Sequence, residues 1–310
     1  MVLILPTRTA ARSRVARRLF STAYTPTHPT HSTSASASPP SHPSTTKAKN
    51  QTVATKECGE DFFFHVDMKN KSGVSFGVAD GITAWLESGV DPALFSQALM
   101  FHAHRYSRSA WAGEPEVDPT LDYAEREEVE GWELTPYECL DLAYGGVLRE
   151  KLVDAGSSTA CIITLNSSNG LLRLGDSGFS IIRDGSILYS QPVQSHFFNC
   201  PKQLTKLPPP TGKRFTRACV DSPREAETYK TQLCNGDIIV AYTDGLSDNS
   251  DAAQVQSMAD RLVIYARECM AAKSRVSPFE RHAARQGMFF PGDWGCSVTV
   301  IVALVRETEA

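Results

Sequence analysis

Acidic residues are missing from the first 56 positions of this 310-residue chain. That stretch contains eight Arg and Lys residues, and because the whole chain has a net charge of −4, the remainder has a net charge of −12. The chain after residue 56 is therefore strongly acidic, whereas nucleic-acid binding needs basic patches that displace counterions. We therefore expect no nucleic-acid partner, and a body suited to gathering carboxylates around cations.

Long apolar runs and paired cysteine motifs are also missing. No stretch approaches the roughly 18 consecutive apolar residues of a membrane-spanning helix, so we expect no membrane insertion. The eight cysteines contain no C-x-x-C spacing, and several, such as Cys161, lie in apolar runs. We interpret them as small buried residues of a reducing compartment, in preference to zinc ligands or a disulfide framework.

The first 56 residues contain mainly Arg, Ser, Thr, Ala and Pro. In residues 1–25, arginines alternate with Ala, Val, Leu and Phe, which is typical of a mitochondrial presequence. We predict mitochondrial import, to the matrix; the alternatives are chloroplast import and a disordered basic tail that binds an anion. Residues 26–56 have too little apolar surface to offset the entropy lost on folding, so we predict a disordered linker.

Residues 57–307 show short apolar segments separated by turn signals, which predicts one α+β domain. We expect buried strands over residues 74–79, 159–165, 237–242 and 297–305. A strand over 171–182 and another over 186–190 should form a hairpin around Asp184-Gly185. Helical periodicity covers 93–106, 135–153 and 252–272, with start signals at Asp91-Pro92 and Thr135-Pro136. The acidic stretch 113–133 is expected to be a surface loop and a candidate substrate-recognition element.

Carboxylates fall at the ends of several of these apolar segments. The six positions are Glu60, Asp61, Asp80, Asp176, Asp244 and Asp248. One Asp-Gly pair is most often only a turn, but this repetition is harder to explain that way. Clustered carboxylates repel one another unless cations compensate them, and ligands that are all oxygen favour Mg²⁺ or Mn²⁺ over zinc.

Several segments carry a resemblance to a known family. They are Gly59-Glu-Asp61, Gly77-Val-Ala-Asp-Gly81 with Trp85, Gly89-Val-Asp-Pro92, Gly156-Ser-Ser-Thr-Ala160, Leu174-Gly-Asp-Ser-Gly-Phe179, His196-Phe-Phe-Asn199, Gly236-Asp-Ile-Ile238 and Thr243-Asp-Gly-Leu-Ser-Asp-Asn249. In this order and spacing they resemble the metal-dependent, type 2C (PPM) protein phosphatases, most closely their mitochondrial branch. The resemblance extends from about Gly59 to Val305.

The resemblance implies an α/β/β/α four-layer sandwich with two Mn²⁺ or Mg²⁺ ions at one end. Asp80 would bridge both ions, Gly81 would contribute its carbonyl oxygen, and Glu60 and Asp61 would hold one ion. Asp244 would hold the other ion, which makes Asp80 and Asp244 the expected catalytic positions. Three aspartates match positions that bind a weaker third ion in some members: Asp176, Asp244 and Asp248.

The implied activity is that of a protein serine/threonine phosphatase acting as a monomer on phosphorylated proteins. In such a two-metal hydrolase a hydroxide shared between the cations attacks phosphorus, and the metals neutralise charge on the phosphoryl oxygens.

Two departures from the family pattern leave other functions open. Thr83 and Ala84 replace glycines beside Asp80-Gly81, where they could narrow the site or shift the backbone. Cys296 and Ser297 occupy the place of an acidic pair whose first Asp ligates a metal, and Asp293 is the nearest substitute. The alternatives are therefore a weak or inactive pseudophosphatase that acts as a binding or regulatory module, and a hydrolase of small phosphorylated metabolites.

Overall fold

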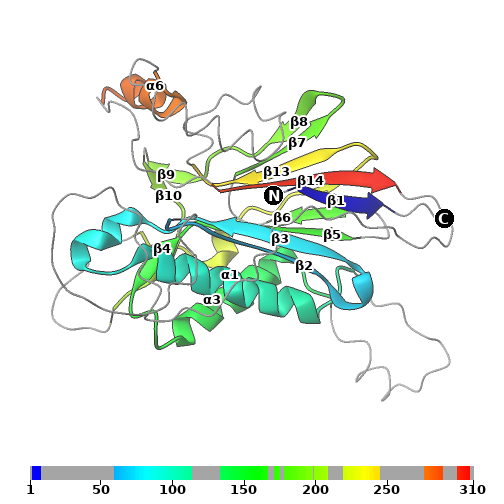
Figure 1. Ribbon diagram of the computed structural model, residues 1–310. Coiled ribbons are helices and arrows are strands. Elements are labelled where there is room, and N and C mark those ends of the chain that lie inside the picture. The colour runs from blue at the N-terminus through cyan, green and yellow to red at the C-terminus, as the bar shows by residue number, and fades with distance from the viewer. Residues whose placement is uncertain are drawn as a thin grey trace, which may run out of the picture.

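The computed structural model describes residues 2–7, 59–113, 133–166, 171–174, 178–197, 199–208, 219–244, 276–288 and 299–307. Two five-stranded sheets pack face to face, and a pair of helices covers the outer face of one of them (Figure 1). This layered arrangement confirms the expected α+β class. The helix expected over 252–272 and the linker expected over 26–56 lie outside the described residues.

The sheet beneath the helices is antiparallel throughout, in the order β12-β6-β5-β3-β2. Its strands are β2 (Phe62–Asp67), β3 (Gly73–Ala79), β5 (Cys161–Asn166), β6 (Leu171–Leu174) and β12 (Lys230–Gln232). Strands β3 and β5 are buried along nearly their whole length. The helices cover one face and the second sheet covers the other, which explains why their sequences are continuous apolar runs.

The second sheet has the order β1-β14-β13-β7-β8. Its strands are β1 (Val2–Thr7), β7 (Phe179–Arg183), β8 (Ser186–Ser190), β13 (Ile238–Tyr242) and β14 (Val300–Glu307). Strand β1 pairs parallel with β14, and the other pairs are antiparallel. Since β1 lies within the segment expected to be a presequence, residues 1–25 contain at least one element of the folded sheet; import itself stays a prediction.

The two helices begin where the start signals predicted. Helix α1 (Pro92–Ser109) is capped by Asp91, whose carboxylate accepts a hydrogen bond from the Ala93 amide at 3.0 Å. Helix α3 (Pro136–Arg149) opens with a reciprocal capping box between Thr135 and Glu138. Each cap satisfies amide groups that the first helical turn leaves unpaired, so the local sequence alone fixes these boundaries.

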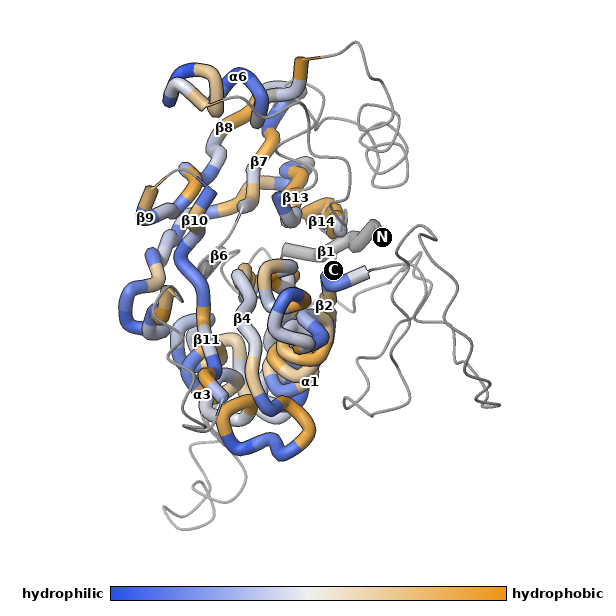
Figure 2. Tube along the Cα trace, turned by 90° about the vertical axis from the view of Figure 1, so that its left-hand side faces the viewer, coloured by the Kyte–Doolittle hydropathy of each residue, from blue (hydrophilic) through white to orange (hydrophobic). Residues whose placement is uncertain are grey.

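Two hydrophobic cores separate the three layers. One lies between the helices and the first sheet and includes Phe64, Phe95, Leu99, Leu140 and Ile162. The other lies between the sheets and includes Phe76, Ile163, Phe179, Ile239 and Ile301. Figure 2 shows hydrophobic residues along β13 and β14, in contrast to the hydrophilic α6 (Pro278–Arg285) at the periphery.

The strand expected over 171–182 is wrong as a single element. The chain forms β6 in the first sheet and then β7 in the second, with residues 175–177 between them outside the described residues. Both halves are apolar, so periodicity could not show that the chain changes sheets. The hairpin from β7 to β8 is confirmed, with positive φ angles of 50° at Asp184 and 73° at Gly185.

The remaining elements are short. They are η1 (Lys69–Lys71), η2 (Thr83–Ser88), β4 (Gly156–Ser158), β9 (Ser195–Phe197), β10 (Cys200–Pro201), β11 (Leu204–Lys206) and η3 (Pro223–Glu225). Strand β4 pairs with β11, and β9 pairs with β10. None of the helices described in the structure has the length and apolar character needed to cross a membrane.

Candidate metal centre

Five of the predicted site residues lie in the described part of the chain. Glu60 and Asp61 directly precede β2, Asp80 and Gly81 directly follow β3, and Asp244 follows β13. Antiparallel pairing of β2 with β3 sets Phe62 opposite Ala79, so the acids before β2 and after β3 meet at one sheet edge. The other predicted ligands, Asp176, Asp248 and Asp293, lie outside the described residues.

Asp61 is fully buried, with 0% of its surface exposed. The Thr243 hydroxyl donates a hydrogen bond to Oδ2 of Asp61 at 2.8 Å, whereas Oδ1 is buried without a partner among the described residues. Burial raises the pKa of Asp61 to about 7, the charge of Asp244 adds to this rise, and hydrogen bonds such as that from Thr243 oppose it. Among the described residues no cation offsets the cost of burying this carboxylate.

Asp80 is partly buried and neighbours two other acids. Burial raises the pKa of its carboxyl well above the ordinary value, and the charges of Asp61 and Asp244 raise it further. The strongest electrostatic influences on Asp80 are therefore negative, which is the arrangement that a divalent cation would stabilise.

Thr243 connects the acids to the last strand. Its hydroxyl accepts a hydrogen bond from the Thr299 amide at 3.0 Å, and its amide donates to the Thr299 carbonyl at 3.1 Å. The interpretation of the sequence did not assign a role to either threonine. The one hint in the sequence was the position of Thr243 directly before Asp244. The contact of Thr243 with Asp61 spans 182 positions of sequence, so no local pattern indicates it.

Glu60 and Gly81 are held next to each other by the backbone. The Gly81 amide donates to the Glu60 carbonyl at 3.3 Å, and the Ser96 hydroxyl donates to that same carbonyl at 2.5 Å. A Cβ atom at position 81 would lie 2.6 Å from the carbonyl oxygen of Pro92, so only glycine fits here without a shift of the backbone.

The departure at Thr83 has a specific structural role. The Thr83 hydroxyl donates a hydrogen bond to Oε1 of Glu60 at 2.7 Å. Both Thr83 and Ala84 are exposed, and they lie in η2. The side chain that replaces a glycine thus orients a candidate metal ligand. The second departure, at Cys296 and Ser297, lies outside the described residues.

The described carboxylates fit one part of a site for Mg²⁺ or Mn²⁺. They offer only oxygen donors, one of which is buried and unpartnered at Asp61. Within the described ranges, no three Asp, Glu, His or Cys side chains are grouped closely enough to hold a metal by themselves. Completing the site therefore requires a rearrangement of these side chains on binding or ligands from the positions that are not described.

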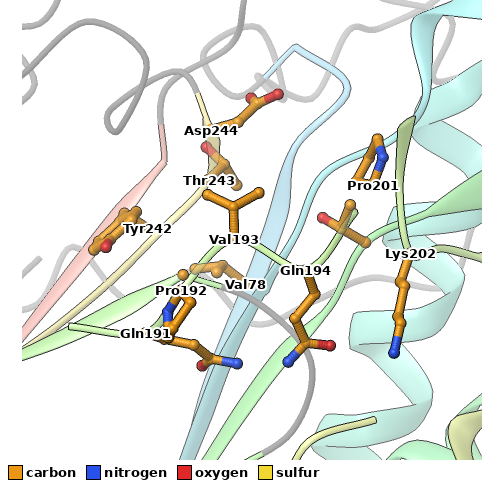
Figure 3. Close-up of a pocket in the computed structure, with 12 residues that line it drawn as sticks. Val78, Gln191, Pro192, Val193, Gln194, Pro201, Lys202, Tyr242, Thr243 and Asp244 are labelled. Atoms are coloured by element: carbon orange, nitrogen blue, oxygen red, sulfur yellow. The ribbon is translucent and has the colours of Figure 1, made fainter. Parts of the chain in front are cut away.

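A pocket adjoins the carboxylates (Figure 3). Its lining comes from both sheets and from the segment between β8 and β9: Val78, Thr159, Gly178, Gln191, Pro192, Val193, Gln194, Pro201, Lys202, Tyr242, Thr243 and Asp244. Figure 3 shows the Asp244 carboxylate near one end, while the Lys202 amino group points away from it. A molecule in this pocket would have its reactive group next to Asp244 and the rest against largely apolar walls.

Two proteins with similar sequences are named as protein phosphatases. The chain is 33% identical over 271 residues to the protein phosphatase PTC7 homolog fig of Drosophila willistoni, covering 81% of this chain and 78% of the relative. It is 30% identical to the human protein phosphatase PTC7 homolog, with 77% of each chain covered. No family model matches the chain.

The solved structure of the photosystem II phosphatase PBCP is similar in fold. It has a TM-score of 0.58 and 26% identity, covering 81% of this chain and 93% of that one. A two-sheet sandwich with acids gathered at the strand ends is the architecture of a metal-dependent phosphatase. The chain belongs to the PTC7 family of protein phosphatases, within the metal-dependent type 2C (PPM) group.

Proposed function

We propose that this protein serine/threonine phosphatase works through two Mn²⁺ or Mg²⁺ ions held by its strand-end acids. The observation that carries the proposal is the buried Asp61, whose Oδ1 has no partner among the described residues and whose neighbours include Asp80 and Asp244. When bound, the ions would supply activation of water and neutralisation of phosphoryl charge.

Each described residue has a distinct task in this proposal. Asp80 would hold both ions, Asp61 and Glu60 would hold one, and Asp244 would hold the other at the mouth of the pocket. Thr243 fixes Oδ2 of Asp61 and leaves Oδ1 for the ion. Because a metal binds the deprotonated acids, and burial favours their protonated forms, loading should release protons and improve as pH rises.

Asp176, Asp248 and Asp293 complete the proposed ligand set. Asp176 and Asp248 would serve a weaker third ion together with Asp244. Asp293 would replace the carboxylate that the family pattern expects at Cys296.

The substrate would be a phosphorylated protein segment seated along the pocket. Val78, Pro192, Val193 and Pro201 give the pocket an apolar wall next to Asp244. This extended surface favours a peptide over a small phosphorylated metabolite. The acid-free, Arg-rich composition of residues 1–25 supports a mitochondrial matrix location for this reaction. We also propose that the protein acts as a monomer.

Activity of the full chain with Mn²⁺ tests this proposal. The full chain is used because Val2–Thr7 forms a strand of the second sheet. Wild type should hydrolyse an aryl phosphate and, with a higher kcat/KM, a phosphothreonine peptide, and EDTA should abolish both reactions. Asp80→Asn should lose nearly all activity, whereas Asp67→Asn, at the exposed far end of β2, should match wild type.

The alternatives predict different results from the same assay. A pseudophosphatase would leave wild type as inert as Asp80→Asn with both substrates. A hydrolase of small metabolites would prefer small phosphate esters over the phosphopeptide.

A further inference from the structure

Two cysteine thiols meet at the edge of the pocket wall. Sγ of Cys200 and Sγ of Cys219 are 2.7 Å apart, although the residues are 19 positions apart in sequence. This is closer than two sulfur atoms approach in ordinary non-bonded contact and longer than a disulfide bond, which is about 2.0 Å. The thiols are therefore already positioned as a reactive pair.

The backbone around each cysteine is fixed independently of the sulfur contact. Cys200 begins β10 and pairs with Phe197 of β9. The Thr205 hydroxyl donates a hydrogen bond to the Cys219 carbonyl at 2.7 Å. Because each residue is held by hydrogen bonds of its own, the proximity of the two thiols follows from the fold.

Reciprocal hydrogen bonds also join the two segments a few residues further on. The Gln203 amide donates to Oδ2 of Asp221 at 2.8 Å, and the Asp221 amide donates to the Gln203 carbonyl at 3.1 Å. His196 contacts Oδ1 of the same carboxylate at 2.9 Å, which orients Asp221 from the β9 side. These contacts join the two segments that carry the thiols at a second place in the fold.

The other described cysteines are arranged differently. Cys139 is buried, its thiol donates to the Ala103 carbonyl, and burial raises its pKa to about 12. Cys161 is fully buried in β5, and Cys234 is exposed. Within the described ranges no metal site of three or more ligands forms around any cysteine. The Cys200–Cys219 contact therefore suits a covalent pairing better than metal binding.

We propose that Cys200 and Cys219 are a thiol modification site that forms a reversible disulfide when the protein meets hydrogen peroxide. This goes beyond the phosphatase activity and requires none of the proposed metal ligands. The bond would join the β9–β10 hairpin to the segment that contains Asp221. Pro201 and Lys202, the two residues after Cys200, line the pocket, so the bond would fasten one of its walls (Figure 3).

The reaction uses one peroxide for each pair of thiols. Cys219 is partly exposed, so its thiolate attacks peroxide first; the O–O bond breaks, and a sulfenic acid and water form. Cys200 then loses its proton and attacks the Cys219 sulfur, which breaks the S–O bond and releases a second water. Burial, together with the neighbouring Cys219 thiol, raises the pKa of Cys200 to about 12, which agrees with this order of attack.

Peptide mapping of the full chain with Mn²⁺ tests the proposal. The protein is reduced, freed of reductant, exposed to hydrogen peroxide, alkylated with N-ethylmaleimide and digested. We expect a peptide cross-linked between Cys200 and Cys219, a joint loss of alkylation at both residues, and recovery of both after dithiothreitol. Cys234→Ser should form the same cross-link, whereas Cys219→Ser should form none and should leave Cys200 open to N-ethylmaleimide, which is added after the protein has been unfolded in urea.

Equal alkylation of Cys200 and Cys219 before and after peroxide would overturn the proposal, as would a cross-link from either residue to another cysteine. This readout requires no phosphatase activity, so its failure is distinguishable from failure of the proposed function. If Cys219→Ser does not fold, Cys200→Thr serves as the second variant: it should form no cross-link, and peroxide should leave Cys219 as a sulfenic acid that dimedone labels.

Discussion

Two buried aspartates lie near the two ends of strand β13, and their surroundings differ: Asp237 directly precedes the strand, and Asp61 contacts Thr243 directly after it. Before the strand, Asp237 is 0% exposed and accepts hydrogen bonds from Nε and Nη2 of Arg183 at 2.7 and 2.8 Å and from the Cys234 amide at 2.7 Å. At the other end, Thr243 reaches Asp61, which is also 0% exposed but has one oxygen without a partner among the described residues.

This difference separates an acid that a protein cation compensates from one that has acidic neighbours. The guanidinium of Arg183 is a permanent cation that compensates Asp237, and the carboxylate in turn raises the pKa of Arg183. Asp61 and Asp80 have each other and Asp244 as acidic neighbours, and the charge of Asp244 adds to the rise that burial causes in both of their pKa values. Burial alone does not favour a metal ligand, whereas burial among other acids and without a protein cation is what the proposed metal site would explain.

The largest expected effect is the loss of activity when a carboxylate of the candidate metal centre is removed. Asp80→Asn should lower kcat/KM by on the order of 10³-fold, because metal activation contributes several kcal/mol to the transition state. Steady-state kinetics on a phosphothreonine peptide measures this. Asp67→Asn is the matched control. An equal fall in kcat/KM in both variants would contradict a special role for Asp80.

A pH dependence of stability is the second expected effect. The pKa of Asp61 rises from 3.8 to about 7 on folding, so the folded state favours the protonated form. The contribution of this group to stability is complete below about pH 4 and is lost as pH rises through about 7, amounting to a few kcal/mol. In metal-free protein, Asp61→Asn should therefore unfold at higher urea than wild type at about pH 8 but not at about pH 4.

Added Mn²⁺ supplies the control for this pH effect. It should restore the stability of wild type at the higher pH and have less effect on Asp61→Asn, because the ion binds the charged carboxylate. Parallel pH profiles for the two metal-free proteins would contradict a raised pKa at Asp61.

Removing Asp237, the acid that is paired with Arg183, should lower the free energy of unfolding and leave kcat unchanged. Asp237→Ala should lower the free energy of unfolding by about 2 kcal/mol, less than for a fully buried ion pair because the Arg183 side chain is 32% exposed. Urea denaturation measures this loss. The kcat of the protein that remains folded should equal that of wild type, and a large fall in kcat would mean that this end of β13 also serves the reaction.

The smallest expected effect concerns the orientation of Glu60. Thr83→Val removes the hydroxyl that donates to Oε1 of Glu60, and an exposed hydrogen bond to a charged group contributes about 1 kcal/mol. The concentration of Mn²⁺ for half-maximal activity should rise about fivefold, as read from a metal titration. Thr83→Ser keeps the hydroxyl and should behave as wild type.

Much of the fold could be predicted from local sequence. The caps at Asp91 and Thr135 use contacts within three residues, so the helix starts were visible in the chain. The acids at positions 61, 80 and 244 were recognisable because each adjoins a strand. The change of sheet between β6 and β7 was not, since both segments are apolar and nothing local distinguishes the two sheets.

The contacts that sequence reasoning missed join residues far apart in the chain. The hydrogen bond from Thr243 to Asp61 and the approach of Cys200 to Cys219 exist only after the sheets and the β9–β10 hairpin have assembled. The pairing of Val2–Thr7 with β14 is equally remote, because β14 lies at the other end of the chain. Local patterns identified residue types for these positions but could not supply their partners.

Direct measurement of metal binding tests the central claim that Asp61, Asp80 and Asp244 hold divalent cations. Isothermal titration of the EDTA-treated full chain with Mn²⁺ should show binding of two ions by wild type and by Asp67→Asn, with proton release that varies with pH. Asp80→Asn should lose this binding. The absence of Mn²⁺ binding by folded wild type, or unchanged binding by Asp80→Asn, would contradict the account.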